Sequence, residues 1–189
     1  MLNTFEAIRK DIDQRLADAA SNRRSAMHTP VVATADADAR VMVLRGWAPD
    51  TRTLRFHTDA RAPKVAEIGE GAPVGVLFYD REAKIQLRCR GIGRIEREGP
   101  IADKAWADSD NFARRCYLGE APGAQAEEAT SGLPPRFEGV EPSEQELAPA
   151  RSNFAVLLVE LETIDWFYLS NDGHRRVLFT HDGAQWVAP

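Results

Sequence analysis

Apolar residues near the N-terminus recur every three or four positions, which is the spacing of one face of an α-helix. Polar residues fill the positions between them, and the run ends at the polar segment "SNRRS". The pattern predicts an amphipathic helix over about residues 3–20. Its expected apolar face consists of Phe5, Ile8, Ile12, Leu16 and Ala19.

The next segment contains shorter apolar runs that are rich in β-branched residues. "TPVVATADADARVMVLRGW" predicts a hairpin around the polar turn "ADADA", and "LRFHT" predicts a third strand after the turn "APDTRT". In a continuous strand over residues 40–46, Val41, Val43 and Arg45 would share one face. Pro63 then suits the first position of a short helix, "PKVAEIGEG".

Two contrasting strand patterns follow. "PVGVLFYD" is almost continuously apolar and predicts a strand that is buried on both faces. "AKIQLRCRGIGRIE" alternates instead, so we expect Ile85, Leu87 and Cys89 to share one face. Gln86 and Arg88 would lie on the opposite face.

The rest of the chain combines short helices, a long loop and a C-terminal hairpin. "GPIADKAWADSDNFARRCYL" predicts one or two helices, and residues 119–142 predict a surface loop. Ser143 and Glu146 have the spacing of a capping box at the start of another short helix. "NFAVLLVELETIDWFYL" and "HRRVLFT" predict a hairpin over about residues 153–189.

These elements predict a mainly β protein of the α+β class. Antiparallel strands dominate, and the helices serve as connections. A closed or partly closed barrel would remove the unpaired edges of so long a meander. At 189 residues we expect a single domain over residues 1–189.

The composition of the chain limits the classes of binding partner that we expect. The formal net charge is −5, whereas a nucleic-acid surface needs a basic footprint. The N-terminus lacks the apolar region of a signal peptide, and no run approaches the roughly 18 apolar residues of a membrane span. Cys89 and Cys116 form no metal-binding spacing and predict free thiols in a reducing compartment. We therefore expect a soluble cytoplasmic protein with no metal, nucleic acid or membrane partner.

Four cations surround the second and third strands and the short helix. Arg40 and Arg45 belong to the strand region, while Arg61 and Lys64 bracket the helix start. Helix N-termini and guanidinium groups bind phosphate oxygens, and Thr58 would add a hydroxyl. The same residues could instead form a solvated rim, and the pattern by itself leaves both interpretations open.

The positions of the four histidines do not indicate a metal site. Their spacing does not resemble a metal site, such as two histidines four residues apart on a helix. His28 and His181 are expected at the surface. No arrangement of serine, histidine and aspartate indicates a nucleophile, so we assign no catalytic residue.

The order of several motifs resembles a known family. "RxxxLRG", "FHTDxRxPK" and "QLRxRG" are followed by "RRCYLGEAPG", "DWFYLSNDGHRRVLF" and the terminal "WVAP". Together these motifs are similar to the pyridoxamine 5'-phosphate oxidase-like family of FMN-binding split barrels. The resemblance runs from about residue 28 to the end of the chain.

The resemblance implies a six-stranded antiparallel split barrel with flanking helices, and a homodimer with FMN between the subunits. The C-terminal hairpin would close the site. Val43 and Leu44 would pack on the flavin ring, and Thr58 and Lys64 would hold the phosphate. The complete set of cofactor residues that it implies is Arg40, Val43, Leu44, Arg45, His57, Thr58, Arg61, Lys64, Gln86, Phe167 and Arg176.

The resemblance supports the family's substrate less well than it supports the cofactor. Asp172 stands where the oxidases have an arginine that holds the substrate. The candidate substrate residues are Arg45, His174, Arg114 and Arg115. We expect an FMN-dependent oxidoreductase that takes hydride from a small molecule, with a non-catalytic flavin- or haem-binding storage module as the alternative. A deazaflavin in place of FMN also stays open.

Overall fold

The computed structural model describes residues 3–189, which form two compact units. The first unit contains the chain up to Phe56 together with the ranges Glu70–Arg94 and Leu158–Pro189. The second unit contains His57–Gly69 and Ile95–Leu157.

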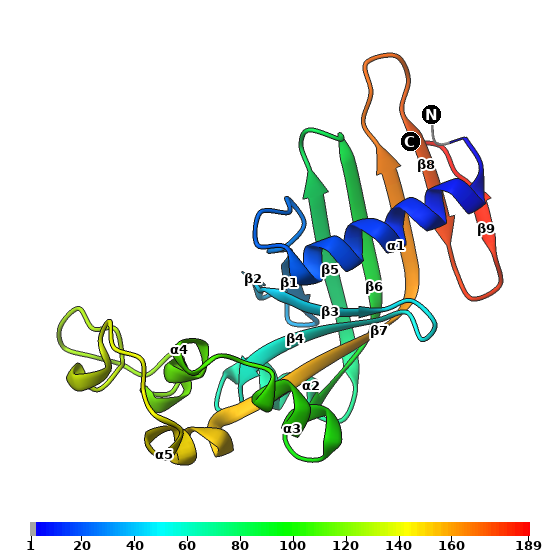
Figure 1. The fold of residues 1–189 in the computed structure, drawn as a ribbon. Helices are drawn as coiled ribbons and strands as arrows, with labels where there is room; N and C mark the ends of the chain where they lie inside the picture. The colour runs from blue at the N-terminus through cyan, green and yellow to red at the C-terminus, as the bar shows by residue number, and fades with distance from the viewer. Residues whose placement is uncertain (1–2) are drawn as a thin grey trace. The chain divides into compact units, whose positions relative to one another are not determined.

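The first unit is built on a sheet of nine strands within residues 3–189 (Figure 1). The strand order is β2-β1-β5-β6-β7-β4-β3, and β8 pairs with β7 while β9 pairs with β8. The bounds are β1 Val31–Thr34, β2 Ala39–Val41, β3 Leu44–Ala48, β4 Thr53–Asp59, β5 Ala72–Asp80, β6 Ile85–Glu96, β7 Phe154–Tyr168, β8 Arg175–Phe179 and β9 Ala184–Trp186. Strands β4, β6 and β7 continue at one end into the second unit.

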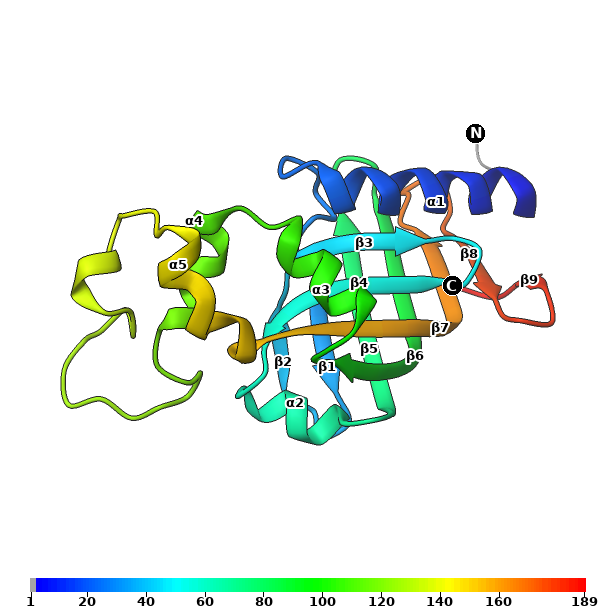
Figure 2. The same cartoon turned by 60° about the horizontal axis from the view of Figure 1, so that its bottom comes forward.

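The sheet confirms the predicted fold class. It is mostly antiparallel and curled, and β3 and β4 run across the direction of β5 and β6 (Figure 2). Strands β1, β5, β6, β7, β4 and β3 form a path of six, as the family resemblance implies. The short strand β2 and the hairpin β8–β9 are added to this path.

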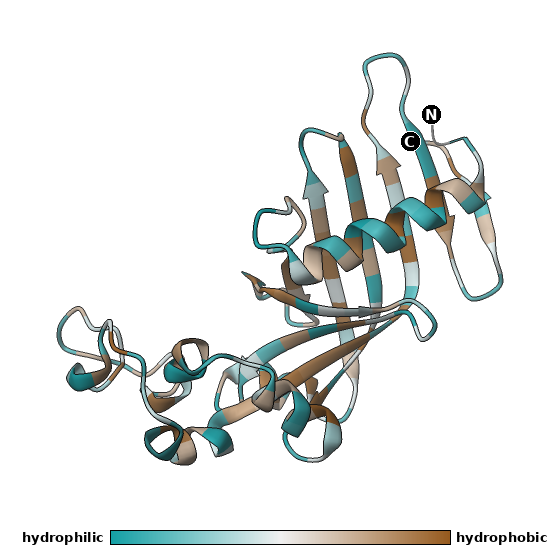
Figure 3. Cartoon of the chain, viewed as in Figure 1, coloured by the Kyte–Doolittle hydropathy of each residue, from teal (hydrophilic) through white to brown (hydrophobic). Residues whose placement is uncertain are grey.

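Helix α1, Phe5–Ser21, covers one face of the sheet (Figure 1). The Thr4 hydroxyl caps its start by accepting a hydrogen bond from the Ala7 amide at 3.2 Å. Its polar side faces outward in Figure 3. The predicted apolar face is confirmed, because the buried residues of the helix are Ile8, Ile12, Leu16 and Ala19.

The two contrasting strand predictions have different outcomes. Ile85, Leu87 and Cys89 of β6 are buried, as the alternation predicts. The prediction that β5 is buried on both faces is wrong, because Leu77 and Tyr79 are 39% and 49% exposed. The apolar run therefore marks an outward sheet face with apolar side chains rather than a strand inside a parallel sheet.

The expected continuous strand over residues 40–46 is interrupted. Strand β2 ends at Val41 and β3 begins at Leu44, where the chain leaves the pairing with β1. The Leu44 amide donates to the carbonyl of His28 at 2.9 Å. His28 is also buried rather than exposed, and its ring Nδ1 lies 2.6 Å from the carbonyl oxygen of Ala19. It is a satisfied core histidine.

Gly91 marks a close approach of two strands in the first unit. A Cβ atom added there would lie 1.9 Å from the carbonyl oxygen of Glu160. Because no real Cβ comes so near a backbone atom, only glycine fits this position of β6 without displacing β7.

The second unit consists of short helices and irregular chain. Its α-helices are α2 Pro63–Ile68, α3 Pro100–Ala107, α4 Asn111–Arg114 and α5 Glu144–Leu147. Three 3-10 helices cover Arg115–Leu118, Pro135–Phe137 and Ala148–Asn153. The predicted capping box of Ser143 and Glu146 is present.

An aromatic cluster forms the centre of the second unit. The Phe154 ring makes edge contacts with Trp106 at 5.4 Å, Tyr117 at 5.1 Å and His57 at 5.0 Å between centroids. Such pairs stabilise a core beyond the area that they bury. Among the described helices of residues 3–189, none is long and apolar enough to cross a membrane.

Candidate functional site

One group of predicted residues lies on the outward face of the sheet in the first unit. Tyr79 of β5 pairs with Gln86 of β6, and Phe167 of β7 pairs with Arg176 of β8. Directly paired residues share a face of the sheet. His174 contacts Phe167 edge to face at 5.5 Å. Four predicted residues therefore lie in the same unit, and Phe167 has direct neighbours among them.

Asp165 fixes the guanidinium of Arg176. Arg176 donates from Nε to one oxygen of Asp165 at 2.9 Å and from Nη2 to the other at 2.8 Å. Arg88 donates to the same carboxylate from β6. Sequence reasoning missed Asp165, although an acid two residues from the expected aromatic position could have indicated a partner for the arginines.

Burial and charge act in opposite directions on Asp165. Burial disfavours the ionised carboxylate, but the hydrogen bonds from Arg176 and Arg88 outweigh it and lower the pKa of Asp165. The same hydrogen bond raises the pKa of Arg176. The three side chains therefore stay charged at neutral pH and carry a net positive charge on this face.

The predicted residues of the β2–β3 segment have different surroundings. Arg40 donates to Asp38 and, at 3.2 Å, to the hydroxyl of Thr34. Leu44 is fully buried, so its side chain packs in the core. Val43 and Arg45 are half-buried, and within residues 3–189 the Arg45 guanidinium has no hydrogen-bond or ion-pair partner.

The phosphate candidates His57, Thr58, Arg61 and Lys64 belong to the second unit. Thr58 is 4% exposed, and its hydroxyl reaches only the carbonyl of Asp59, at 3.5 Å. Lys64 is half-buried in the first turn of α2. The sequence therefore locates these residues near one helix start, but they differ in accessibility.

The Arg61 side chain forms hydrogen bonds with residues of the second unit, to which it belongs. It donates to both oxygens of Asp59, at 2.9 and 2.7 Å, and to the carbonyl of Gly119 at 3.0 Å. The hydrogen bond with Asp59 raises the pKa of Arg61. Because its charge is balanced and its donors are engaged, Arg61 joins two loops rather than presenting a bare cation.

The two arginines of the central helices have structural roles. Arg114 is 5% exposed and donates to the carbonyls of Trp106 and Ala107, both at 2.8 Å. It also contacts Glu144 at 3.0 Å. Arg115 donates to the carbonyl of Phe137 at 3.1 Å. In this structure both arginines use donors to hold irregular backbone, and their role toward a substrate stays a prediction.

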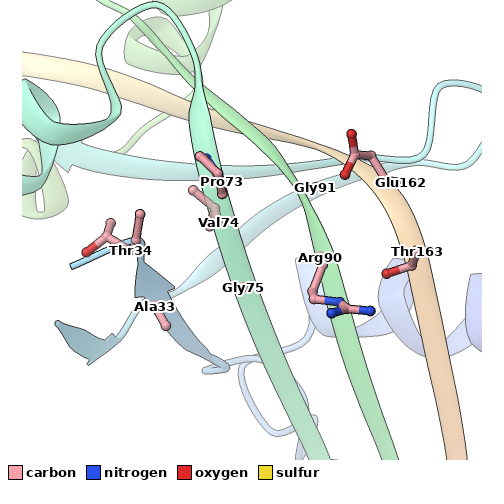
Figure 4. A pocket seen from close by; sticks show the side chains of 10 residues that line it. Ala33, Thr34, Pro73, Val74, Gly75, Arg90, Gly91, Glu162 and Thr163 are labelled. Carbon is pink, nitrogen blue, oxygen red and sulfur yellow. The ribbon is translucent and has the colours of Figure 1, made fainter. Parts of the chain in front are cut away.

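A cavity of about 380 Å³ opens on the same sheet of the first unit (Figure 4). The side chains of Arg90 and Thr163 point toward each other from β6 and β7 in this view. The Thr163 hydroxyl is buried and lacks a hydrogen-bond partner within residues 3–189. The lining residues are Ala33, Thr34, Ala35, Pro73, Val74, Gly75, Arg90, Gly91, Glu162 and Thr163.

No metal centre is found in the part of the chain that the structure describes. Residues 3–189 contain no group of three or more histidine, cysteine, aspartate or glutamate side chains that could hold an ion.

Known structures share this fold. A pyridoxamine 5'-phosphate oxidase-related FMN-binding protein from Nostoc punctiforme is 21% identical, with a TM-score of 0.71 over 96% of both chains. PhzG from Burkholderia lata is 19% identical, with a TM-score of 0.66 over 95% of this chain and 91% of that one. A general stress FMN/FAD-binding protein from Xanthomonas citri is 13% identical, with a TM-score of 0.54 over 88% and 92%. At these identities the likeness concerns the fold, which defines a split barrel of the FMN-binding type.

A sequence match to a family model covers part of the N-terminal half of the chain. Residues 7–96 match the family model described as pyridoxamine 5'-phosphate oxidase, FMN-binding domain. This match confirms the predicted resemblance to the pyridoxamine 5'-phosphate oxidase-like family for this part of the chain. A comparison with curated proteins finds no match.

Proposed function

We propose that this protein binds FMN and acts as an oxidoreductase on a small molecule. The observation that carries the proposal is the match of residues 7–96 to an FMN-binding domain. This segment contains every proposed cofactor residue except Phe167 and Arg176. Those two lie on the outward sheet face with Gln86, which supports a role for this face in the same site.

The side chains fit a flavin phosphate and ring in chemical type. Lys64 is the proposed phosphate ligand, and Arg45 offers a guanidinium without a partner within residues 3–189. Phe167 would pack on the ring, while Gln86 would supply an amide donor. His57 and Val43 would line the pocket. When bound, FMN would accept hydride from the substrate and pass the electrons to an acceptor.

Within the proposed set we assign different roles according to burial and hydrogen-bond partners. Leu44 and Thr58 are buried and would shape the site rather than reach the ligand through their side chains. Arg61 would position the loop that precedes Lys64, since it is bound to Asp59. Arg40, paired with Asp38, and Arg176, paired with Asp165, would act as oriented cations.

The direct test compares FMN with riboflavin by fluorescence quenching. FMN should bind more tightly, because Lys64 addresses the phosphate. Lys64→Ala should weaken FMN by about 1–3 kcal/mol, the scale of a lost charge-assisted hydrogen bond, and leave riboflavin unchanged. Lys104→Ala is the control, since Lys104 is exposed on α3 and pairs only with Asp108. Equal affinity for the two flavins would contradict the phosphate assignment.

We also propose a homodimer. The outward sheet face carries exposed Leu77, Tyr79 and Ile92, of which Tyr79 pairs with the cofactor candidate Gln86. Apolar patches of this kind favour association. Leu77→Glu should produce monomers in light scattering and lower FMN occupancy, whereas Val140→Glu, exposed in the second unit, should do neither. A monomeric wild type with full FMN occupancy would contradict a shared site.

Pyridoxine 5'-phosphate is a poor candidate for the substrate. Asp172 places a like charge where the family has a cation, and Arg114 and Arg115 are bound to other partners. A mismatched charge can cost several kcal/mol, or orders of magnitude in kcat/KM. Anaerobic mixing with pyridoxine 5'-phosphate should leave the flavin absorbance unchanged. Rapid bleaching at micromolar substrate would show that another residue compensates.

A further inference from the structure

A second cavity in the first unit lies apart from the residues proposed for FMN. Its volume is about 450 Å³, within the range of small-molecule sites. The first two turns of α1, the turn before β4 and the β8–β9 hairpin form its walls. The residues that matter for its chemistry are Phe5, Glu6, Arg9, Arg52, Phe179 and His181.

Two arginines line this cavity. Within residues 3–189, neither the Arg9 nor the Arg52 guanidinium makes a hydrogen bond or ion pair. Burial lowers the pKa of Arg52, and the charge of Arg9 lowers it further. Asp13 acts in the opposite direction but less strongly, and its carboxylate accepts a hydrogen bond from Trp47 at 3.1 Å. The two cations thus repel each other beside an open space.

The remaining lining is largely apolar. The rings of Phe5 and Phe179 meet edge to face with centroids 6.5 Å apart, and Trp186 lies against Phe5 at 5.4 Å. Among the described lining residues Glu6 is the one acid, and the lining also includes two arginines and a histidine. A ligand of this cavity would therefore meet positive charge and aromatic surface together.

We propose that this cavity binds an organic carboxylate with an aromatic or similarly apolar body. A carboxylate can accept paired hydrogen bonds from a guanidinium and would relieve the repulsion between Arg9 and Arg52. The rings of Phe5 and Phe179 provide the contact for the apolar part. A bare inorganic anion would leave this surface unused, and a neutral molecule would leave the arginines unpaired. The proposal is independent of flavin binding.

Benzoate is the probe, and isothermal titration calorimetry on the full chain is the measurement. We expect a dissociation constant of about 1 mM or below. Arg9→Gln and Arg52→Asn should each weaken binding about tenfold, or about 1.4 kcal/mol. Asparagine is chosen at position 52 because the backbone φ of Arg52 is 51°, which asparagine tolerates. Glu6→Gln should strengthen binding about threefold by removing a like charge.

The controls distinguish binding in this cavity from nonspecific attraction of an anion to positive charge on the protein. Lys10→Gln removes a cation from the same helix outside the cavity and should leave the affinity for benzoate unchanged. Benzamide, the neutral analogue, and inorganic phosphate should both bind at least tenfold more weakly than benzoate. Equal binding of benzamide or phosphate, an effect of Lys10→Gln as large as that of Arg9→Gln, or no binding of benzoate would overturn the proposal.

Discussion

The two units of this protein satisfy their backbone groups in different ways. In the first unit the strands pair with one another, and long ladders use the amides and carbonyls. In the second unit much of the chain is irregular, and arginine side chains donate hydrogen bonds to some of its backbone carbonyls. Arg61 donates to the carbonyls of Gly119 and Glu120, and Arg114 donates to those of Trp106 and Ala107. Arg115 donates to the carbonyls of Phe137 and Val140, and Arg151 donates to that of Arg97.

This difference determines what an arginine can do. A guanidinium has five donors, and an irregular loop offers many carbonyls without partners. In the first unit many carbonyls are paired within the strand ladders, and Arg9, Arg45, Arg52 and Arg90 make no hydrogen bond or ion pair through their side chains within residues 3–189. The donors of these four arginines are therefore available to ligands.

The largest expected effect tests how tightly the ladders of the first unit pack. Gly91→Ala would place a methyl group 1.9 Å from the carbonyl oxygen of Glu160, and the strands would have to separate. We expect a loss of about 4 kcal/mol in the free energy of unfolding, measured by urea denaturation. Gly75→Ala is the matched control, because its Cβ would lie 4.0 Å from the Ala33 side chain. A loss below 1 kcal/mol for Gly91→Ala would contradict the close approach.

The next effect tests the structural role of arginine in the second unit. Arg114→Ala removes the donors to the carbonyls of Trp106 and Ala107 at the end of α3. These carbonyls then stay inside the second unit without their arginine partner. The expected loss is about 3 kcal/mol in the free energy of unfolding. Lys104→Ala, an exposed ion pair of the same unit, should cost under about 0.5 kcal/mol. If the two variants were equally stable, Arg114 would be available for a ligand after all.

A smaller effect concerns the charged cluster of the first unit. Asp165→Asn should cost about 2 kcal/mol at pH 7, because two charge-assisted partners are lost. The pKa of Asp165 is lowered in the folded state, so its contribution is complete above the unfolded pKa of about 4 and disappears as the pH falls below that value.

The pH dependence provides the check on this assignment. Urea midpoints of wild type and Asp165→Asn should differ at pH 7 and converge toward pH 3. Asp182→Asn, in the exposed β8–β9 turn, should match wild type at pH 7. A difference that stays constant between pH 7 and pH 3 would mean that the carboxylate charge contributes nothing.

The smallest effect compares the two thiols and involves no change in stability. Cys89 of the first unit is 1% exposed, and burial raises its pKa to about 12. Cys116 of the second unit is exposed. Ellman's reagent at pH 8 should therefore titrate one thiol in the native protein and two in urea, and Cys116→Ser should abolish the native reaction. Two native thiols reacting at one rate would contradict the burial of Cys89.

Much of the architecture could be predicted because it depends on local pattern. The helical spacing from Phe5 to Ala19, the alternation of β6 and the capping box at Ser143 each specify an element through neighbouring residues. The family motifs added the strand path and the cofactor class. The apolar run of β5 was misinterpreted, because hydrophobicity alone does not tell a buried face from an exposed apolar one.

The sequence by itself determined most of the elements, the resemblance to a family and the types of side chain offered to a ligand. Only the tertiary structure decided which of those side chains have partners already. Arg61 and Arg45 look alike in the sequence, yet Arg61 is bound to Asp59 and to a loop 58 residues away, whereas Arg45 has no such partner within residues 3–189. The physical reason is that a guanidinium reaches acceptors that are distant in the chain, and only folding brings those acceptors within hydrogen-bonding distance.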